Sequence, residues 1–262
     1  MLSIITPSLN NVRSIEKTIS SVIGQSGVDF EYIIVDGGST DGTLDVIRAH
    51  EGKINYWISE PDRGISHAFN KGIGLANGDI IGILNVGDWY EPDTLKNVVD
   101  AFSSHPDVDV VCGALEFWEE GAAQLHCHSN PEALDKETSV YHPTMFVRKS
   151  SYVKYGVFDE GFRYAMDYEL MLRFKQQGAK FLTLEKTLAN MSLDGISYHN
   201  WYAGLKEVRN ARSKYFPRYN VAYNHVLAIL KNLIARALKK SGLRHLYQAY
   251  WQSKNQRIRS KI

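Results

Sequence analysis

Short apolar runs alternate with helical patterns along the first two thirds of the chain. The runs lack the strict polar alternation of half-buried strands, which is typical of strands covered on both faces. They span Leu2–Thr6, Tyr32–Val35, Ile54–Ile58, Ile80–Leu84 and Val108–Cys112. Apolar residues at helical spacing lie between them, in Asn11–Gln25, Leu44–Ala49 and Ile65–Ala76. This order of strand and helix predicts an α/β fold with a mostly parallel sheet.

Three of the expected strands end in polar loops. The loops read Pro7-Ser8-Leu9-Asn10, Asp36-Gly37-Gly38-Ser39 and Asn85-Val86-Gly87-Asp88. Asp and Asn are poor strand residues, and glycine lets a ligand approach the backbone closely. Because ligands of parallel α/β sheets bind beyond the carboxyl ends of the strands, these loops predict a binding site at that edge. The alternative is that they are the ordinary polar loops that follow strands.

From about Tyr202 the pattern becomes helical only. His225–Lys240 carries an apolar stripe against basic residues, and after an interruption at Gly242 the pattern resumes in Leu243–Trp251. We therefore expect two parts, a domain over residues 1–205 and a basic amphipathic helical extension over residues 206–262.

The net charge of +1 hides an uneven distribution. Residues 206–262 hold 14 Lys and Arg against one acid, Glu207, and the rest of the chain holds 16 basic and 28 acidic residues. Three explanations stay open: a solvated charged face, pairing with a second copy, or contact with an anionic membrane, where each basic residue contributes about 1 kcal/mol. Nucleic acid would also attract this charge, but nothing else in the sequence favours it.

Length and composition narrow the class of protein. A chain of 262 residues with 44% hydrophobic residues fits one large domain, alone or with an appendage. It has no apolar run long enough to span a bilayer, and its first residues lack the pattern of a signal peptide. Cys112 and Cys127 have no metal-ligand spacing, so we expect free thiols in a reduced, cytoplasmic compartment, with peripheral contact at the inner face of the cell membrane as the open explanation above.

Several segments together carry a resemblance to a known family. SIITPSLNN, YIIVDGGSTDGT, EPDRGISHAFNKGIGLANGD, ILNVGDWYEPD, HPTMFVRKS and YAMDYELMLRF resemble, in this order, the inverting family 2 glycosyltransferases with a GT-A fold. Each motif alone is weakly specific for the family, but their occurrence in this order over roughly residues 1–200 is strongly specific. The similarity is greatest to bacterial enzymes that build surface polysaccharide. It implies a Rossmann-like, mostly parallel sheet flanked by helices.

The resemblance implies a hexosyl- or N-acetylhexosaminyl-transferase. Such an enzyme moves a sugar from a UDP-sugar to a hydroxyl of a glycan or lipid-linked oligosaccharide, with Mg²⁺ or Mn²⁺. It also implies donor contacts at Pro7, Ser8, Asn10, Asp36, Asp62, Arg63 and Asn70.

Two of these donor contacts have a simpler alternative. The Asp36 carboxylate can accept a hydrogen bond from a uracil N–H or a ribose hydroxyl, or it can cap its own turn at Ser39 and Thr40. Arg63 can face the base or a phosphate, or it can be an ordinary surface arginine.

The metal motif departs from the family pattern. The family has Asp-x-Asp where this chain has Asn85-Val86-Gly87-Asp88. The resemblance implies that Asp88 binds the metal, and that Asn85 assists through its carbonyl or contacts the sugar, because hard cations prefer oxygen ligands. His199 belongs to a segment that resembles the flexible part closing over the donor, and it is a second candidate ligand.

Asp167 resembles the catalytic base of the family, which removes a proton from the acceptor hydroxyl. Met166 precedes it where the family has Glu, and Asp167 can also serve as a cap or first-turn charge of a helix. Glu169 is a further candidate. His142 resembles a position near the acceptor or the diphosphate, and can equally be a loop histidine.

Two rival functions belong to other classes. Gly87 and Met166 leave open a degenerate, non-catalytic module that binds nucleotide-sugar or glycan. A dinucleotide enzyme or nucleotidyltransferase is disfavoured, because the turn after Val35 reads DGGSTDG rather than G-x-G-x-x-G.

Overall fold

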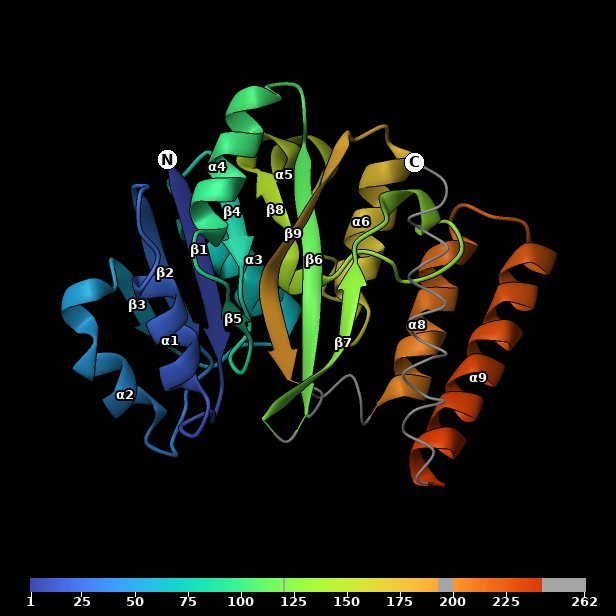
Figure 1. Ribbon diagram of the computed structural model, residues 1–262, viewed down its shortest axis with the longest axis horizontal. Coiled ribbons are helices and arrows are strands. Elements are labelled where there is room, and N and C mark those ends of the chain that lie inside the picture. The colour runs from blue at the N-terminus through green and yellow to red at the C-terminus, as the bar shows by residue number, and fades with distance from the viewer. Residues whose placement is uncertain (120, 193–199, 242–262) are drawn as a thin grey trace.

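The protein is a mixed α/β structure with a curled, mostly parallel sheet flanked by helices (Figure 1). The computed structural model describes residues 1–119, 121–192 and 200–241. The expected helix Leu243–Trp251 and the candidate ligand His199 lie outside these residues. The fold class expected from the sequence is confirmed.

The sheet has the strand order β3-β2-β1-β4-β8-β6-β9-β5, with β7 paired to β6. Strands β1 to β4 run parallel to one another, β8 is antiparallel to both β4 and β6, and β9 is parallel to β6. The carboxyl ends of β1, β2 and β4 therefore meet at one edge. The strands span Leu2–Ser8 (β1), Phe30–Asp36 (β2), Tyr56–Ser59 (β3), Ile80–Ile83 (β4), Trp89–Tyr90 (β5), Val110–Glu119 (β6), Ala122–His128 (β7), Phe146–Arg148 (β8) and Phe181–Ser192 (β9).

Helices cover both faces of this sheet. Ile5 and Ile33 belong to a core cluster that includes residues of α3, α5 and α6, whereas Ile4 and Ile34 belong to a second cluster that includes residues of α1, α2 and α4. This double burial is the reason that the strands read as continuous apolar runs. The helices span Ile15–Ile23 (α1), Thr43–Ala49 (α2), Ile65–Leu75 (α3), Thr94–Ser104 (α4), Lys149–Tyr155 (α5), Met166–Gln176 (α6), Trp201–Ser213 (α8) and Arg218–Lys240 (α9).

Some element boundaries differ from the sequence expectation. Helix α1 begins at Ile15 rather than Asn11, because the Asn11 carbonyl accepts hydrogen bonds from the backbone N–H groups of Ser14 and Ile15 and so closes a turn first. Strand β6 continues past Cys112 to Glu119, where it pairs with both β7 and β9. Strand β3 begins at Tyr56 instead of Ile54.

Helices α8 and α9 lie side by side at one end of the molecule (Figure 1). They confirm the helical pattern expected after Tyr202. The expected boundary at residue 205 falls inside α8, and α8 also contacts α6, so the backbone has no break there.

Helix α9 presents its apolar side to solvent. Val221 and Ala235 are buried, while large apolar side chains on another side are between 49% and 78% exposed. These exposed residues form what we call the outer face of α9: Tyr219, Tyr223, Val226, Leu230, Leu233 and Ile234. In the part of the chain that the structure describes, every helix is too short or too polar to cross a membrane.

Candidate active site

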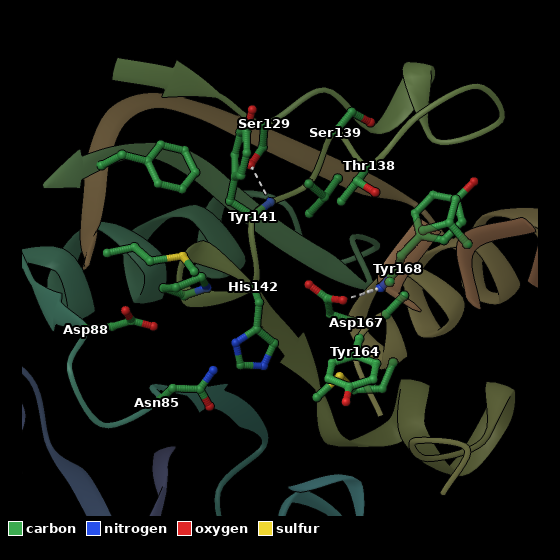
Figure 2. Close-up of a pocket in the computed structure, with 18 of the residues that line it drawn as sticks. Asn85, Asp88, Ser129, Thr138, Ser139, Tyr141, His142, Tyr164, Asp167 and Tyr168 are labelled. Atoms are coloured by element: carbon green, nitrogen blue, oxygen red, sulfur yellow. Dashed lines mark hydrogen bonds between the residues drawn. The ribbon is translucent and has the colours of Figure 1, made fainter. Parts of the chain in front are cut away.

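One cavity of about 1630 Å³ opens at the carboxyl edge of the sheet. Its walls come from the loops that follow β1 and β4, from the segment between β7 and β8, and from α6, α8 and α9. The sequence-predicted residues Asp88 and Asp167 both line it. In Figure 2 their carboxylates point into this space from opposite sides, and His142 lies between them.

The loop after β4 is a tight turn held by α1. The Asp88 N–H donates to the Asn85 carbonyl at 3.1 Å. The Thr18 hydroxyl donates to the Asp88 carbonyl at 2.8 Å and accepts from the Gly87 N–H at 3.0 Å. Gly87 has a φ of +99°, in the left-handed region that favours glycine. The left-handed backbone at this position therefore explains why a glycine stands where the family motif has its second acid.

This turn directs two buried oxygen-bearing groups into the cavity. Asp88 is 5% exposed, and loss of solvent raises the pKa of its carboxyl well above the usual range, opposed only by a hydrogen bond from the Ser192 backbone. The Asn85 Oδ1 atom is buried and has no hydrogen-bond partner among the described residues. Buried polar atoms without partners are rare in proteins, so the Asn85 oxygen beside the buried Asp88 carboxyl indicates a site that a ligand completes.

Two more unpartnered polar atoms lie on the same cavity. The Ser8 Oγ and His142 Nδ1 atoms are buried without a hydrogen-bond partner in the described part of the chain. The His142 ring stacks on Phe69, with 5.1 Å between centroids and 8° between planes. Burial lowers the pKa of His142 to about 4, so its imidazole is neutral near pH 7.

Asp167 is the second residue of α6. Its Oδ1 accepts the Tyr168 N–H at 2.8 Å, drawn in Figure 2. Desolvation raises the pKa of Asp167 to about 6, backbone hydrogen bonds from Tyr168 and from Asp167 itself oppose this, and the charge of Glu207 adds to it. A carboxylate with this pKa is suited to accept a proton near neutral pH.

Glu207, on α8, holds the loop before Asp167. Its carboxylate accepts the backbone N–H groups of Arg163 at 3.1 Å, Tyr164 at 2.7 Å and Ala165 at 2.9 Å. Helix α6 has no capping side chain of its own, so Glu207 supplies the acceptor for its N-terminal donors. No role for Glu207 was predicted from the sequence, although Glu207 is the only acid of residues 206–262.

Glu169 and Met166 lie near Asp167 on α6 but contact different parts of the protein. Glu169 is 1% exposed and pairs with Arg173 at 3.0 Å and with Lys214 at 3.4 Å. This ion-pair cluster accounts for the burial of the Glu169 carboxylate, and a contribution of Glu169 to the chemistry stays a prediction. Met166 lines the cavity as an apolar wall beside Asp167.

The predicted donor residues divide into two groups. Pro7, Ser8 and Asp62 line the cavity, and the Asp62 carboxylate accepts the Gly64 N–H at 2.8 Å. The described cavity walls do not include Asn10 or Arg63. The Asn10 Oδ1 accepts the Thr40 N–H at 3.0 Å, which joins the loops after β1 and β2.

Asp36 is a fully buried turn cap. Its carboxylate accepts the N–H groups of Gly38 and Ser39 and the hydroxyls of Ser39 and Ser59, at 2.6 to 3.0 Å. Asp36 does not line the cavity. The alternative reading of Asp36 as a loop cap describes these contacts, and its contact with a nucleotide stays a prediction.

Arg63 and Asn70 contact the segment that follows α5. Arg63 forms an exposed ion pair with Glu160 at 2.9 Å. Asn70 donates to the Phe158 carbonyl at 2.9 Å and accepts its N–H at 3.0 Å, so both ends of this amide are used within the protein. Asn70 is also outside the cavity walls, and the nucleotide contacts of both residues stay predictions.

The metal prediction rests on few protein ligands. Within the described residues no three His, Cys, Asp or Glu side chains gather as a metal-binding group. A cation held by Asp88 and Asn85 would therefore need further ligands from outside the described side chains. The second candidate ligand, His199, is outside the described part of the chain.

Comparison with known proteins identifies the family of this chain. The family model described as Glycosyl transferase family 2 matches residues 3–171. A PGL/p-HBAD biosynthesis glycosyltransferase from Mycobacterium bovis (strain BCG / Pasteur 1173P2) is 30% identical over 182 residues, which cover 66% of this chain and 69% of that protein.

Solved structures share the fold. TarS from S. aureus, in complex with UDP-GlcNAc, has a TM-score of 0.65 and 17% identity over 80% of this chain and 66% of its own. The mannosyltransferase PcManGT from Pyrobaculum calidifontis, in complex with GDP-Man and Mn²⁺, has a TM-score of 0.67 and 18% identity over 96% of this chain and 83% of its own. This chain spans less than two thirds of the TarS chains. These likenesses confirm the expected GT-A fold.

Proposed function

This chain belongs to glycosyl transferase family 2 and is a glycosyltransferase, and from that premise we propose that it moves a sugar from a UDP-sugar to an acceptor hydroxyl with inversion. The acceptor is a glycan or a lipid-linked oligosaccharide. The observation that carries the proposal is that Asp88 and Asp167, from separate elements, line one cavity.

The donor occupies the side formed by the ends of β1 and β4. Pro7, Ser8 and Asp62 lie there, and the unpartnered Ser8 hydroxyl is available to a nucleotide hydroxyl or carbonyl. Asp36 and Asn10 act on the donor indirectly, because their hydrogen bonds fix the loops that form this wall. Two structures of this fold contain a nucleotide-sugar, which supports a donor of this class.

The residues present fit a hard divalent cation, Mg²⁺ or Mn²⁺. A buried carboxylate with few hydrogen bonds and an unpartnered amide oxygen are the oxygen donors that such ions prefer. Asp88 and Asn85 would hold the ion from the protein side. When bound, the ion neutralises the charge that grows on the departing diphosphate.

Asp167 removes the proton of the attacking hydroxyl. Its position at the start of α6 and its hydrogen bond from Tyr168 fix the carboxylate toward the cavity. The neutral His142 ring, stacked on Phe69, lies between the two carboxylates and contacts the sugar or the diphosphate as a hydrogen-bonding group without charge.

The outer face of α9 supports contact with an anionic membrane. Helix α9 contains basic residues and no acid, and its exposed apolar side includes two tyrosines, which favour the membrane interface. The same helix lines the cavity with Lys231, Asn232 and Ala235. Membrane contact at this face therefore brings a lipid-linked acceptor close to Asp167.

A two-stage experiment tests the transferase proposal. Thermal stabilisation by a panel of UDP- and GDP-sugars with Mn²⁺ identifies the donor, and release of UDP with and without acceptor glycans measures turnover. Asp167→Asn should abolish transfer and leave UDP binding nearly unchanged, whereas Asp88→Asn should weaken UDP binding only when Mn²⁺ is present.

The outcomes also decide on the non-catalytic module suggested by Gly87 and Met166. Binding of a nucleotide-sugar without transfer or hydrolysis, under every metal and acceptor condition, would support that module. Full transfer activity in Asp167→Asn would exclude Asp167 as the base.

A further inference from the structure

A second hollow, of about 320 Å³, lies between α8, α9 and the loop of residues 136–138. We call it the Arg212 pocket. Lys136, Thr138, Leu205 and Lys231 line both this pocket and the large cavity, so the two spaces are neighbours. The Arg212 pocket is built from the elements on the α8 and α9 side, whereas the loop carrying Asp88 belongs to the donor side.

Positive charge predominates in this pocket. Of the residues that the structure describes, Lys136, Arg209, Arg212 and Lys231 line it against one acid, Glu137. Lys231 pairs with Glu137 at 3.5 Å. Among the described residues, no carboxylate forms an ion pair with the other three cations. The pocket therefore has an excess of positive charge after its internal pair is counted.

Arg212 differs from the other three cations of the pocket because it is buried. It is 3% exposed, with one amino group donating to the Lys136 carbonyl at 3.4 Å and the other to Asn220 Oδ1 at 3.2 Å. Its Nε atom is buried without a hydrogen-bond partner in the described part of the chain. A buried guanidinium with neutral partners and a vacant donor is costly unless an anion completes it.

A histidine in the same pocket responds to this charge. The pKa of His225 is lowered by desolvation and by the neighbouring charges of Arg209 and Lys206, while a hydrogen bond that the ring donates to the Leu205 backbone raises it. His225 therefore adds a neutral hydrogen-bonding group rather than another charge. The cations that line the pocket make its electrostatic potential positive without a charge on His225.

We propose that the Arg212 pocket binds an anionic group of the acceptor, either a phosphate or a carboxylate. A guanidinium fork with two flexible cations beside it matches both groups. The inference rests on the proposed transferase function, because the pocket adjoins the cavity in which Asp167 activates the acceptor. Two sources supply this chemistry: the diphosphate of a lipid-linked saccharide and the carboxylate of an acidic sugar.

Calorimetry on the full chain tests the pocket without requiring transfer. The probes are farnesyl diphosphate, with farnesol as its uncharged counterpart, and glucuronic acid. All are titrated with saturating UDP and without divalent metal, and UDP affinity is measured separately. Arg212→Gln removes the buried charge, Arg209→Gln removes an accessible one, and Arg48→Gln on the distant helix α2 is the matched control.

We expect at least one anionic probe to bind and Arg212→Gln to weaken it about tenfold or more. Arg209→Gln should weaken it less, and Arg48→Gln should leave it unchanged. Selective binding of farnesyl diphosphate over farnesol assigns a lipid diphosphate, and selective binding of glucuronate assigns an acidic sugar.

Two results would overturn the inference. One is the absence of binding by every anionic probe, and the other is wild-type affinity in folded Arg212→Gln. If that variant does not fold, unchanged affinity in both Arg209→Gln and Lys136→Gln has the same meaning. If the transferase proposal is wrong, the wild-type chain should instead show no UDP binding or no turnover, while it still binds the anionic probe.

Discussion

The Thr18 hydroxyl donates a hydrogen bond of 2.8 Å to the carbonyl of Asp88, across two elements that are far apart in the sequence. Thr18 is fully buried on α1, and the same hydroxyl accepts the Gly87 N–H. A helix on one face of the sheet thus fixes the direction of the proposed metal-binding carboxylate. Thr18 is a positioning residue, because it does not line the cavity itself.

Thr18→Val keeps the shape of the side chain and removes both hydrogen bonds. We expect the free energy of unfolding to fall by about 1–3 kcal/mol, because buried backbone groups lose their partner. UDP affinity should fall several-fold with Mn²⁺ present and stay unchanged without it, as titration calorimetry can measure. Ser20→Ala removes a hydroxyl from the exposed side of α1 and is the control. Equal UDP affinity in Thr18→Val and wild type would contradict the positioning role.

The pH dependence of transfer should report Asp167. Burial raises the pKa of this carboxyl to about 6, and a base acts only in its charged form. The rate should therefore rise tenfold per pH unit below about pH 6 and become flat above about pH 7. His142 has a pKa of about 4, so it does not account for a midpoint near 6. Asp167→Asn should remove this acid limb, and an unchanged acid limb in the residual activity of that variant would show that Asp167 is not the group that titrates.

Glu207→Gln should affect transfer through Asp167. The substitution keeps one acceptor oxygen for the loop before α6 but removes the charge that helps to raise the pKa of Asp167. We expect kcat to fall about tenfold with the donor KM nearly unchanged, because three charge-assisted hydrogen bonds weaken. The midpoint of the pH profile should also move to lower pH, which a merely destabilising substitution would not cause.

Glu16→Gln is the control for this experiment, because Glu16 is an exposed acid on α1, 57% accessible to solvent. If both variants keep the wild-type midpoint, the charge of Glu207 does not reach Asp167.

The outer face of α9 should decide attachment to anionic vesicles. Replacing Tyr223 and Leu230 by Ser removes apolar surface that is 65% and 49% exposed, so the fold should be kept. We expect the variant to lose flotation with phosphatidylglycerol vesicles, and the wild type to lose it at high salt. Val153→Ser removes a side chain that is 84% exposed on α5 and should float like wild type. Undiminished flotation of the α9 variant would count against the membrane proposal.

The sequence predicted the first half of the sheet well and the second half poorly. The early strands are parallel and buried on both faces, so they are continuous apolar runs. Strand β9 instead mixes buried Leu188 with exposed Glu185 and Lys186, and β7 has exposed Ala122 and Ala123, so neither has a clear period. Their pairing with β6 depends on contacts that no local pattern encodes.

The site shows the same division between local and distant information. Asp88 and Asp167 lie in local motifs, after an expected strand and at the start of a helical pattern, so the resemblance of these motifs to the family was enough to select them. The partners of Asn70 and Glu207 come from other elements, at Phe158 and at the loop before α6. Sequence alone does not distinguish such internal hydrogen bonds from contacts with a ligand.

The anchoring of the α6 loop by Glu207 has a consequence for building chimaeric enzymes. The family model ends at residue 171, before the helix that supplies this carboxylate. A chimaera joined there would combine the α6 loop of this chain with the α8 of the other protein. The proposed base would then lose the carboxylate that supports its loop, even though every matched motif had been transplanted. An exchange of C-terminal segments between relatives should therefore be joined after Ser213, so that α6 and α8 travel together.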